Sequence, residues 1–182
     1  RKEKLEDKLR VPNDQRLTVI WNYLKRRNAS PNRIQRTCEL TDFHPFFIER
    51  IGELIKIENK LERIRKNIPK KILLKAKHNG FSDSHISHLT GKKEETIRNQ
   101  RKRMNITSSF LMVDTCAGEF EAKTPYFYST YADQKSEYKV EKSIVILGSG
   151  PIRIGQGIEF DYSTVHGVQA VRKAGYEAVV VN

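Results

Sequence analysis

The stretch that decides the fold is residues 143–182, SIVILGSGPIRIGQGIEFDYSTVHGVQAVRKAGYEAVVVN. A β-branched run at residues 144–147 enters a glycine-rich loop, and a second apolar run occupies Glu177–Val181. Between them apolar residues recur at helical spacing. Gly175 follows at the position where a helix often ends in a left-handed residue, a conformation that glycine adopts without steric cost. The inward positions of that helix are Val165, Val168, Ala170, Val171 and Ala174. The pattern predicts a strand, a loop, a helix and a parallel strand, which together form a Rossmann-like βαβ unit.

The loop of this unit carries glycines at Gly148, Gly150, Gly155 and Gly157. Their spacing differs from the G-x-G-x-x-G dinucleotide fingerprint, and the second strand ends in Asn182 rather than in an acidic residue for a ribose. Pro151 also removes one backbone donor from the loop. Two interpretations stay open from the pattern alone. One is a phosphate-type loop, and the other is a glycine turn that only allows close packing of helix and strand.

The chain divides by charge as well as by pattern. Residues 1–110 carry 27 Lys and Arg against 13 Asp and Glu, whereas residues 111–182 carry 7 against 9. We predict a mainly α-helical domain at residues 1–110, a bridging segment at 111–142 and a truncated βαβ unit at 143–182. Because two parallel strands do not bury both faces of a sheet and the first residue is Arg1, we expect a piece of a longer polypeptide.

Three helices are expected before residue 66. The first follows a cap at Asn13 or Asp14 and turns Leu17, Ile20, Trp21 and Leu24 inward. The second starts at Ser30-Pro31, with Ile34, Cys38 and Leu40 inward.

The longest helix is expected over residues 45–65, after Thr41 or Asp42. Its apolar stripe consists of Phe47, Ile51, Leu54, Ile55, Leu61 and Ile64, widened by Phe46, Ile48 and Ile57. So wide a face indicates either a central helix packed on several sides, which we prefer, or a helix with a partner surface.

Residues 73–106 show the order of short helices and turns that is typical of a helix-turn-helix motif. Asn79-Gly80 ends one helix, Ser82 caps a short one with Ile86 and Leu89 inward, and Gly91 turns into a basic helix over residues 92–104. The exposed cations expected there are Arg98, Arg101, Lys102 and Arg103. A DNA-binding role is therefore an alternative, in which these side chains contact phosphates and guanine edges.

The histidines and cysteines predict no metal site. His85 and His88 are spaced to share a helix face, but no cysteine or carboxylate cluster completes a shell around them, and His166 is not expected to be catalytic. Cys38 and Cys116 stand alone, and no signal peptide or long apolar run is present. We expect a cytoplasmic protein with no membrane partner.

In the bridging segment, residues 116–120 are expected to form a turn anchored by Phe120. Tyr126, Phe127, Tyr128 and Tyr131 are expected to pack between modules rather than to stack on bases, because no basic residues interleave them.

Three stretches resemble the carbamoyl-phosphate synthetase large subunit. GSGPIRIGQGIEFDYSTVHGVQAVRKAGYEAVVVN resembles the start of its second synthetase half, in the pre-ATP-grasp domain, and VDTCAGEFEAKTPYFYSTY at residues 113–131 resembles the segment before that half. DQRLTVIWNYLKRRNASPNRIQRTCELTDFHPFFIERIGELIKIENKL resembles the start of its oligomerisation domain. The resemblance makes the nucleic-acid alternative the weaker one.

The resemblance implies a parent ligase that makes carbamoyl phosphate from bicarbonate, glutamine-derived ammonia and two ATP, with Mg²⁺ or Mn²⁺, for arginine and pyrimidine synthesis. Its implied partners are the rest of the large subunit, a glutamine-hydrolysing small subunit and further copies of itself. The ATP-binding residues lie after Asn182 in that family, so we expect this piece to hold no cofactor and no catalytic residue, and to be inactive alone.

The resemblance also assigns Arg153 and Glu159 to the lining of a carbamate tunnel. A guanidinium holds a carbamate with two hydrogen bonds, and a carboxylate orients it. The alternative is that Arg153 and Glu159 pair with each other or with Asp161 across the loop.

Overall fold

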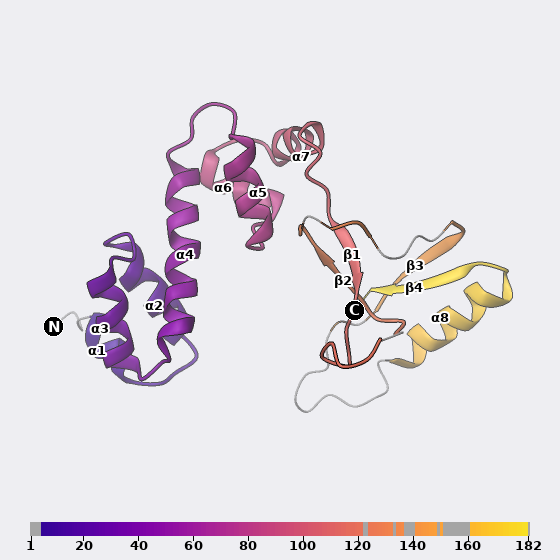
Figure 1. Ribbon diagram of the computed structural model, residues 1–182, viewed down its shortest axis with the longest axis horizontal. Helices are drawn as coiled ribbons and strands as arrows, with labels where there is room; N and C mark the ends of the chain where they lie inside the picture. The colour runs from indigo at the N-terminus through magenta and orange to yellow at the C-terminus, as the bar shows by residue number, and fades with distance from the viewer. Residues whose placement is uncertain are drawn as a thin grey trace. The chain divides into compact units, whose positions relative to one another are not determined.

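The computed structural model describes residues 5–121, 124–132, 134–136, 141–148, 150 and 161–181. These residues form two compact units (Figure 1). The helical unit comprises the described residues of Arg1–Ser109 and Ser129–Gln134, and the second unit those of Phe110–Tyr128 and Lys135–Asn182. As predicted, a mainly helical part precedes a partial α/β part.

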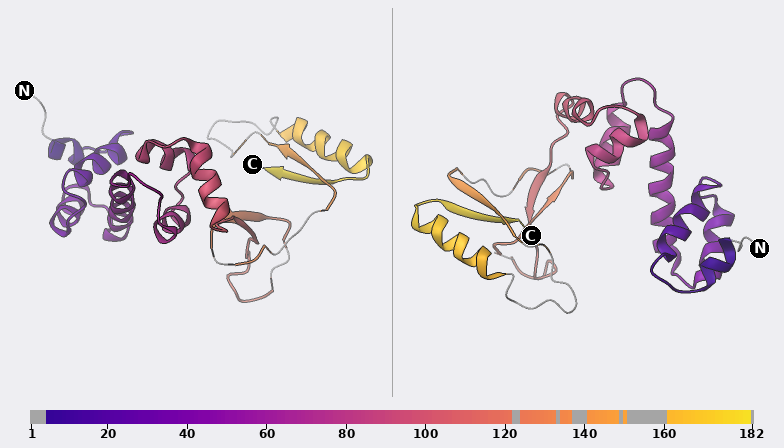
Figure 2. Two further views of the ribbon diagram at one scale, coloured as in Figure 1. Left: turned by 90° about the horizontal axis from the view of Figure 1, so that it is seen from above. Right: turned by 180° about the vertical axis from the view of Figure 1, so that it is seen from behind.

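The helical unit contains α1 to α7, and Figure 2 shows it from two further sides. Their bounds are α1 Leu5–Arg10, α2 Arg16–Lys25, α3 Pro31–Thr41, α4 Pro45–Glu62, α5 Lys70–His78, α6 Asp83–Thr90 and α7 Glu94–Arg103. The central helix is α4, because it contributes to two separate apolar clusters. Ile48 and Ile55 pack with α1, α2 and α3 in the α1–α4 cluster, whereas Ile57 and Leu61 pack with α5, α6 and α7 in the α4–α7 cluster. Central packing of the long helix is confirmed.

Most helix boundaries follow the expected signals. Ser30 and Pro31 begin α3, Ser82 Oγ accepts a hydrogen bond from His85 N at 2.9 Å to begin α6, and Gly91 ends α6 with φ +67°. The cap expected for α4 at Thr41 or Asp42 is wrong. Asp42 instead ends α3 in the left-handed region, and the N-cap of α4 is His44, whose Nδ1 accepts from Phe46 N at 3.3 Å.

Several predicted inward residues face solvent. Leu17, Phe46 and Phe47 are exposed, whereas Ile48 of the predicted stripe is buried, and Tyr23, which was not predicted to face inward, is buried as well. The exposed Phe46 and Phe47 rings contact each other edge to face, with centroids 5.4 Å apart. These aromatic rings mark an unfilled apolar spot at the start of α4.

A two-stranded sheet, β1 (Ser109–Met112) with β2 (Phe127–Thr130), follows α7. The turn that joins them includes Phe120, which is 75% exposed and is therefore not the predicted anchor. Tyr126, Phe127 and Tyr128 are also exposed. Tyr131 is the aromatic residue of this segment that packs on the α4–α7 cluster, with its ring 4.8 Å from Lys77 Nζ.

The βαβ pattern forms as predicted, with β3 Ser143–Leu147, α8 Asp161–Lys173 and β4 Glu177–Val181. The strands are parallel and pair Ile144 with Ala178 and Ile146 with Val180. Gly175 ends the helical segment with φ +80°. Gly167 in α8 lies against Ile146, so α8 covers the sheet face that carries Ile146, while Val165 is half exposed.

None of the described helices combines the length and the apolar character needed to span a membrane.

Candidate assembly surface

The surface that remains open on α4 is charged. Its apolar residues are used by the two clusters, and the exposed or partly exposed positions on the other side repeat at steps of three and four residues. They are Phe46, Glu49, Glu53, Lys56, Lys60 and, just after the helix, Arg63. Apart from Phe46 and Phe47, the wide apolar face inferred from sequence is therefore covered inside the unit, and along the stripe listed above a partner meets charges and the Phe46 ring.

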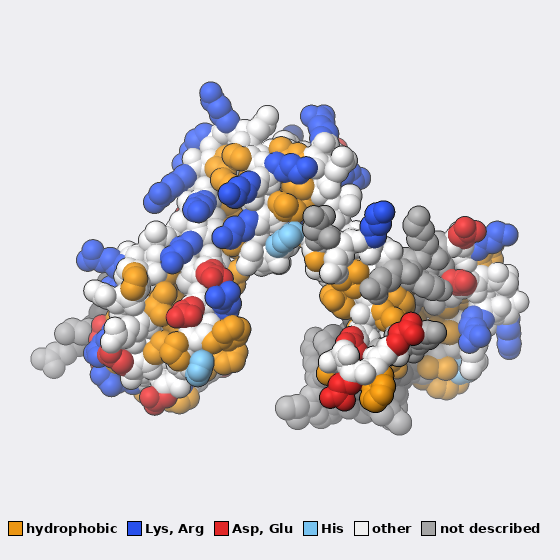
Figure 3. Space-filling model, in the orientation of Figure 1, with side chains coloured by type: hydrophobic (Ala, Val, Ile, Leu, Met, Phe, Trp, Pro, Cys, Tyr) orange, Lys and Arg blue, Asp and Glu red, His pale blue; other side chains and the backbone are white. Residues whose placement is uncertain are grey.

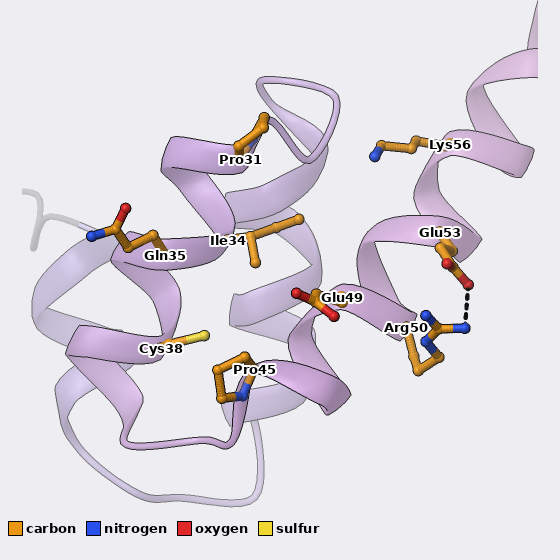
Figure 4. A pocket seen from close by; sticks show the side chains of 9 residues that line it. All are labelled: Pro31, Ile34, Gln35, Cys38, Pro45, Glu49, Arg50, Glu53 and Lys56. Atoms are coloured by element: carbon orange, nitrogen blue, oxygen red, sulfur yellow. Dashed lines mark ion pairs between the residues drawn. The ribbon is translucent and has the colours of Figure 1, made fainter.

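A groove of about 500 Å³ runs beside this face, between α3 and the first half of α4 (Figure 4). Ile34, Cys38 and Pro45 supply apolar lining, and Glu49 and Glu53 supply carboxylates. The remaining lining residues are Pro31, Gln35, Arg50 and Lys56. Glu53 is paired with Arg50 at 2.9 Å, whereas Glu49 forms no ion pair within the described residues. Burial raises the pKa of the Cys38 thiol, so this cysteine contributes apolar surface rather than a thiolate.

The two helices that form the groove are held close by Gly52 of α4. A Cβ on Gly52 would lie 3.2 Å from Ala29 Cβ and 3.3 Å from Ile34 Cδ1. A side chain at residue 52 would press on Ala29 and Ile34, so the glycine favours close packing of α4 on α3.

Charge is distributed unevenly along α4. Figure 3 shows Lys and Arg side chains gathered over the end of α4 and over α5, away from the acidic side chains near the start of α4. The exposed cations of this end are Lys56, Lys60, Arg63, Arg65, Lys66, Lys70, Lys71 and Lys75. The helix therefore presents carboxylates in its first half and cations in its second.

A buried carboxylate joins the two halves of the helical unit. Glu58 of α4 is 6% exposed, with Oε2 2.7 Å from Lys25 Nζ of α2 and Oε1 3.5 Å from His85 Nε2 of α6. Among the described atoms Oε2 has no hydrogen-bond partner of good geometry, so the contact with Lys25 is an ion pair. Burial opposes the charge of Lys25, but its close contacts with the Glu58 and Glu62 carboxylates outweigh the effect of burial and raise the Lys25 pKa.

The cations predicted for nucleic-acid contact are only partly available, because Arg101 is not exposed as expected. Its side chain is 14% exposed, and its Nε and Nη2 both donate to Asp83 Oδ2 at 3.1 Å. Lys77 Nζ lies 2.9 Å from Asp83 Oδ1, and the Tyr131 ring faces both cations. Burial would raise the Asp83 pKa, but hydrogen bonds from Lys77 and Arg101 lower it. Arg101 thus fastens α7 to α6, while Arg98, Lys102 and Arg103 are exposed.

The histidines are placed as helix-surface residues. His85 stacks on Phe81 with ring centroids 5.0 Å apart, and His88 is exposed on the same helix. Within the described residues no three His, Cys, Asp or Glu side chains are grouped so as to hold a metal ion.

The glycine loop is described only at its start. Gly148 N donates to Val181 O at 2.8 Å, which extends the pairing of the strands, and Gly150 has φ +84°. The other loop residues singled out from sequence lie outside the described residues, namely Gly155, Gly157, Arg153 and Glu159. His166 is exposed in α8 and its ring contacts Tyr162 at 4.2 Å.

Comparisons with known proteins match both parts of the chain. Residues 1–105 match the family model described as carbamoyl-phosphate synthetase large chain, oligomerisation domain, and residues 140–182 match the carbamoyl phosphate synthase preATP-grasp domain. The carbamoyl phosphate synthase arginine-specific large chain of Bacillus subtilis (strain 168) is 46% identical over 175 residues. The match covers 94% of this chain and 17% of that relative.

Proposed function

We propose a function from one premise: this chain belongs to the carbamoyl-phosphate synthetase large-chain family, and its residues 1–105 are the oligomerisation domain. The helical unit acts as an assembly segment, which holds copies of the large chain together and takes no part in the chemistry. The observation that carries this role is the exposed face of α4 beside the groove, because the other sides of the helix are covered by the unit's own clusters.

The parent protein is proposed to be a ligase that makes carbamoyl phosphate from bicarbonate, glutamine-derived ammonia and two ATP. ATP and its Mg²⁺ or Mn²⁺ are proposed to bind to parts of the parent protein beyond residues 1–182, as the family resemblance implies. A glutamine-hydrolysing small chain and the rest of the large chain are the proposed partners. Because the Bacillus subtilis relative is named arginine-specific, arginine synthesis is the proposed pathway, with pyrimidine synthesis as its alternative.

The roles of Arg153 and Glu159 remain proposals. In a carbamate tunnel the Arg153 guanidinium would donate two hydrogen bonds to the two carbamate oxygens, and the Glu159 carboxylate would orient the amino group of the carbamate. Alanine at either position in the full-length enzyme is expected to lower carbamoyl phosphate synthesis, with the ATP hydrolysis that depends on bicarbonate alone retained.

Light scattering after size-exclusion chromatography, over a range of concentrations of the 182-residue chain, tests the assembly role. The expected result is a molar mass that rises from one chain toward a dimer or larger species. A mass of one chain at every concentration would overturn it. Binding of a labelled DNA duplex is measured in parallel and is expected to be weak, because Arg101, one of the four cations assigned to that role, is engaged by Asp83.

A further inference from the structure

The exposed face of α4 has the spacing of a helix that pairs with another helix. Phe46, Glu49, Glu53, Lys56, Lys60 and Arg63 follow one another at alternating steps of three and four residues. That repeat keeps side chains on one stripe of a helix and is the spacing by which paired helices contact each other. We call these six residues the α4 seam.

The first half of the seam is acidic and the second half is basic, so two copies of the seam that run in opposite directions have complementary charges. Two carboxylates, Glu49 and Glu53, precede two ammonium groups, Lys56 and Lys60. The members of each pair are four residues apart. In the antiparallel register that places Glu53 opposite Lys56 of a second copy, Glu49 therefore falls opposite Lys60.

The residues at the two ends of the seam also fall opposite each other in this register. Phe46 lies three residues before Glu49, and Arg63 lies three residues after Lys60. The Phe46 ring already lies 5.6 Å from the Arg50 guanidinium. The antiparallel register places it opposite Arg63, where a second cation–π contact is favourable.

We propose that α4 of one chain pairs antiparallel with α4 of a second copy along the α4 seam, with Glu49 and Glu53 opposite Lys60 and Lys56 of that copy. The proposal rests on the assembly role proposed above and names the surface and the register. A two-fold axis relates the copies, so every contact occurs twice and the assembly closes as a dimer at this surface. Parallel pairing is excluded because it would place Glu opposite Glu and Lys opposite Lys.

The lining of the groove beside α4 suits the binding of a lysine side chain. Its lining offers apolar surface at Ile34 and Cys38, and the Glu49 carboxylate stands at its side (Figure 4). The Lys60 side chain of a second copy has the matching chemistry, an aliphatic stem and an ammonium head. Within the described residues Glu49, Lys56, Lys60 and Arg63 form no ion pair. Glu53 is paired with Arg50 at 2.9 Å, so Lys56 of a second copy would share that carboxylate with Arg50.

The strength of such a seam depends on salt. Most of the apolar face of α4 is buried inside the unit, so the seam relies mainly on ion pairs. Exposed ion pairs weaken as salt screens them. The dimer is therefore expected to dissociate more readily at high salt, with a Kd that rises severalfold between about 50 mM and 500 mM salt.

Charge exchange across the seam provides the test. One variant carries Glu49→Lys and Glu53→Lys, and a second carries Lys56→Glu and Lys60→Glu. The first variant makes every charge of the seam positive, and the second makes residues 49, 53, 56 and 60 all negative, with Arg63 unchanged. Each alone is therefore expected to raise the Kd for self-association about a hundredfold or more. A mixture of the two variants is expected to restore the dimer, as is a single chain that carries all four substitutions. Lys71→Glu with Lys75→Glu is the control, because it makes the same charge change on exposed residues of α5.

Analytical ultracentrifugation measures the Kd of each sample, and circular dichroism confirms that each variant is folded. Loss of the dimer in both single-sign variants with recovery in the mixture supports the proposal. A wild-type dimer that the exchanges leave unchanged, or that the control weakens equally, overturns the α4 seam and leaves the assembly role standing. A wild-type chain that stays monomeric overturns both.

Discussion

In the helical unit, α4 packs against α1, α2 and α3 through one cluster and against α5, α6 and α7 through another. In the second unit, α8 covers only one face of the β3–β4 sheet. On the other face Val145 is 57% exposed, Leu147 80% and Val181 52%. These residues share that face because side chains alternate along a strand and β3 pairs in register with β4. The helical unit thus closes its own apolar surface, and the second unit leaves part of its sheet open in the described residues.

The difference teaches where stability resides. Ile20, Leu24, Ile48, Ile55, Leu61 and Leu73 are fully buried in the helical unit. Each such side chain contributes about 1.5–3 kcal/mol relative to exposure. The strands of the second unit bury much less, because parallel sheets rely on cover at both faces. Substitutions should therefore cost much in the first unit and little on the open face of the second.

The largest effect is expected for Asp83→Ala, which leaves Lys77 and Arg101 without their shared carboxylate. The Lys77 side chain is only 5% exposed, so an uncompensated charge remains inside the unit. We expect a loss of about 3–5 kcal/mol in the free energy of unfolding, measured by urea denaturation with circular dichroism. Glu94→Ala, which removes the exposed pair with Arg98, is the matched control and should cost less than about 0.5 kcal/mol. Equal losses in the two variants would contradict a buried role for Asp83.

Acid should weaken the helical unit through the same carboxylate. The Asp83 pKa is lowered below its usual 3.8 in the folded state, so its contribution to stability is complete above that value. As the pH falls below 3.8 and through the folded-state pKa, the contribution is lost. Urea denaturation at a series of pH values should show this loss in the wild type and a smaller one in Asp83→Ala. Parallel pH profiles for the two proteins would be inconsistent with it.

A glycine in each unit gives a smaller contrast. Gly52→Val places methyl groups where Ala29 Cβ and Ile34 already lie within 3.3 Å of a Cβ, and we expect a loss of about 1–3 kcal/mol. Gly167→Ala meets only Ile146 at 3.8 Å and should stabilise α8 by up to about 1 kcal/mol. Thermal unfolding of the two variants measures the signs. A stabilising Gly52→Val would show that α3 and α4 are not held close.

The smallest effect is expected for Leu147→Lys on the open sheet face. Because Leu147 is 80% exposed, the change should alter the free energy of unfolding by no more than about 0.5 kcal/mol. Leu61→Ala, at a fully buried position, is the comparison and should cost about 2–5 kcal/mol. A loss above about 1 kcal/mol for Leu147→Lys would mean that this face is covered.

Local signals predicted the elements well, because their causes lie within a few residues. Ser82, Gly91 and Gly175 begin or end helices as expected, and Glu177–Val181 forms the second parallel strand. Helix faces were less predictable. The sequence pattern placed both Phe47 and Ile48 in the apolar stripe, but only Ile48 is buried. The directions from which α2, α3, α5 and α6 approach decide which face of α4 is covered.

The charged sites could not be read from local patterns at all. Arg101 looks like one more exposed cation of α7, and only the approach of Asp83, 18 residues earlier, removes it from the surface. Glu58 lies on an apolar helix face, and its partners Lys25 and His85 come from helices on either side of α4. The position of this carboxylate within an apolar stripe is a signal that could have indicated a buried ion pair, but its partners could not be identified from the local pattern.

The sharing of α4 by two clusters has a consequence for folding cooperativity. Neither cluster keeps its packing if α4 unwinds, because Ile48 and Ile55 belong to one and Ile57 and Leu61 to the other. The seven helices should therefore melt in a single transition rather than in two. Amide hydrogens at both ends of α4 should exchange with solvent at similar rates, set by one opening event of the whole unit.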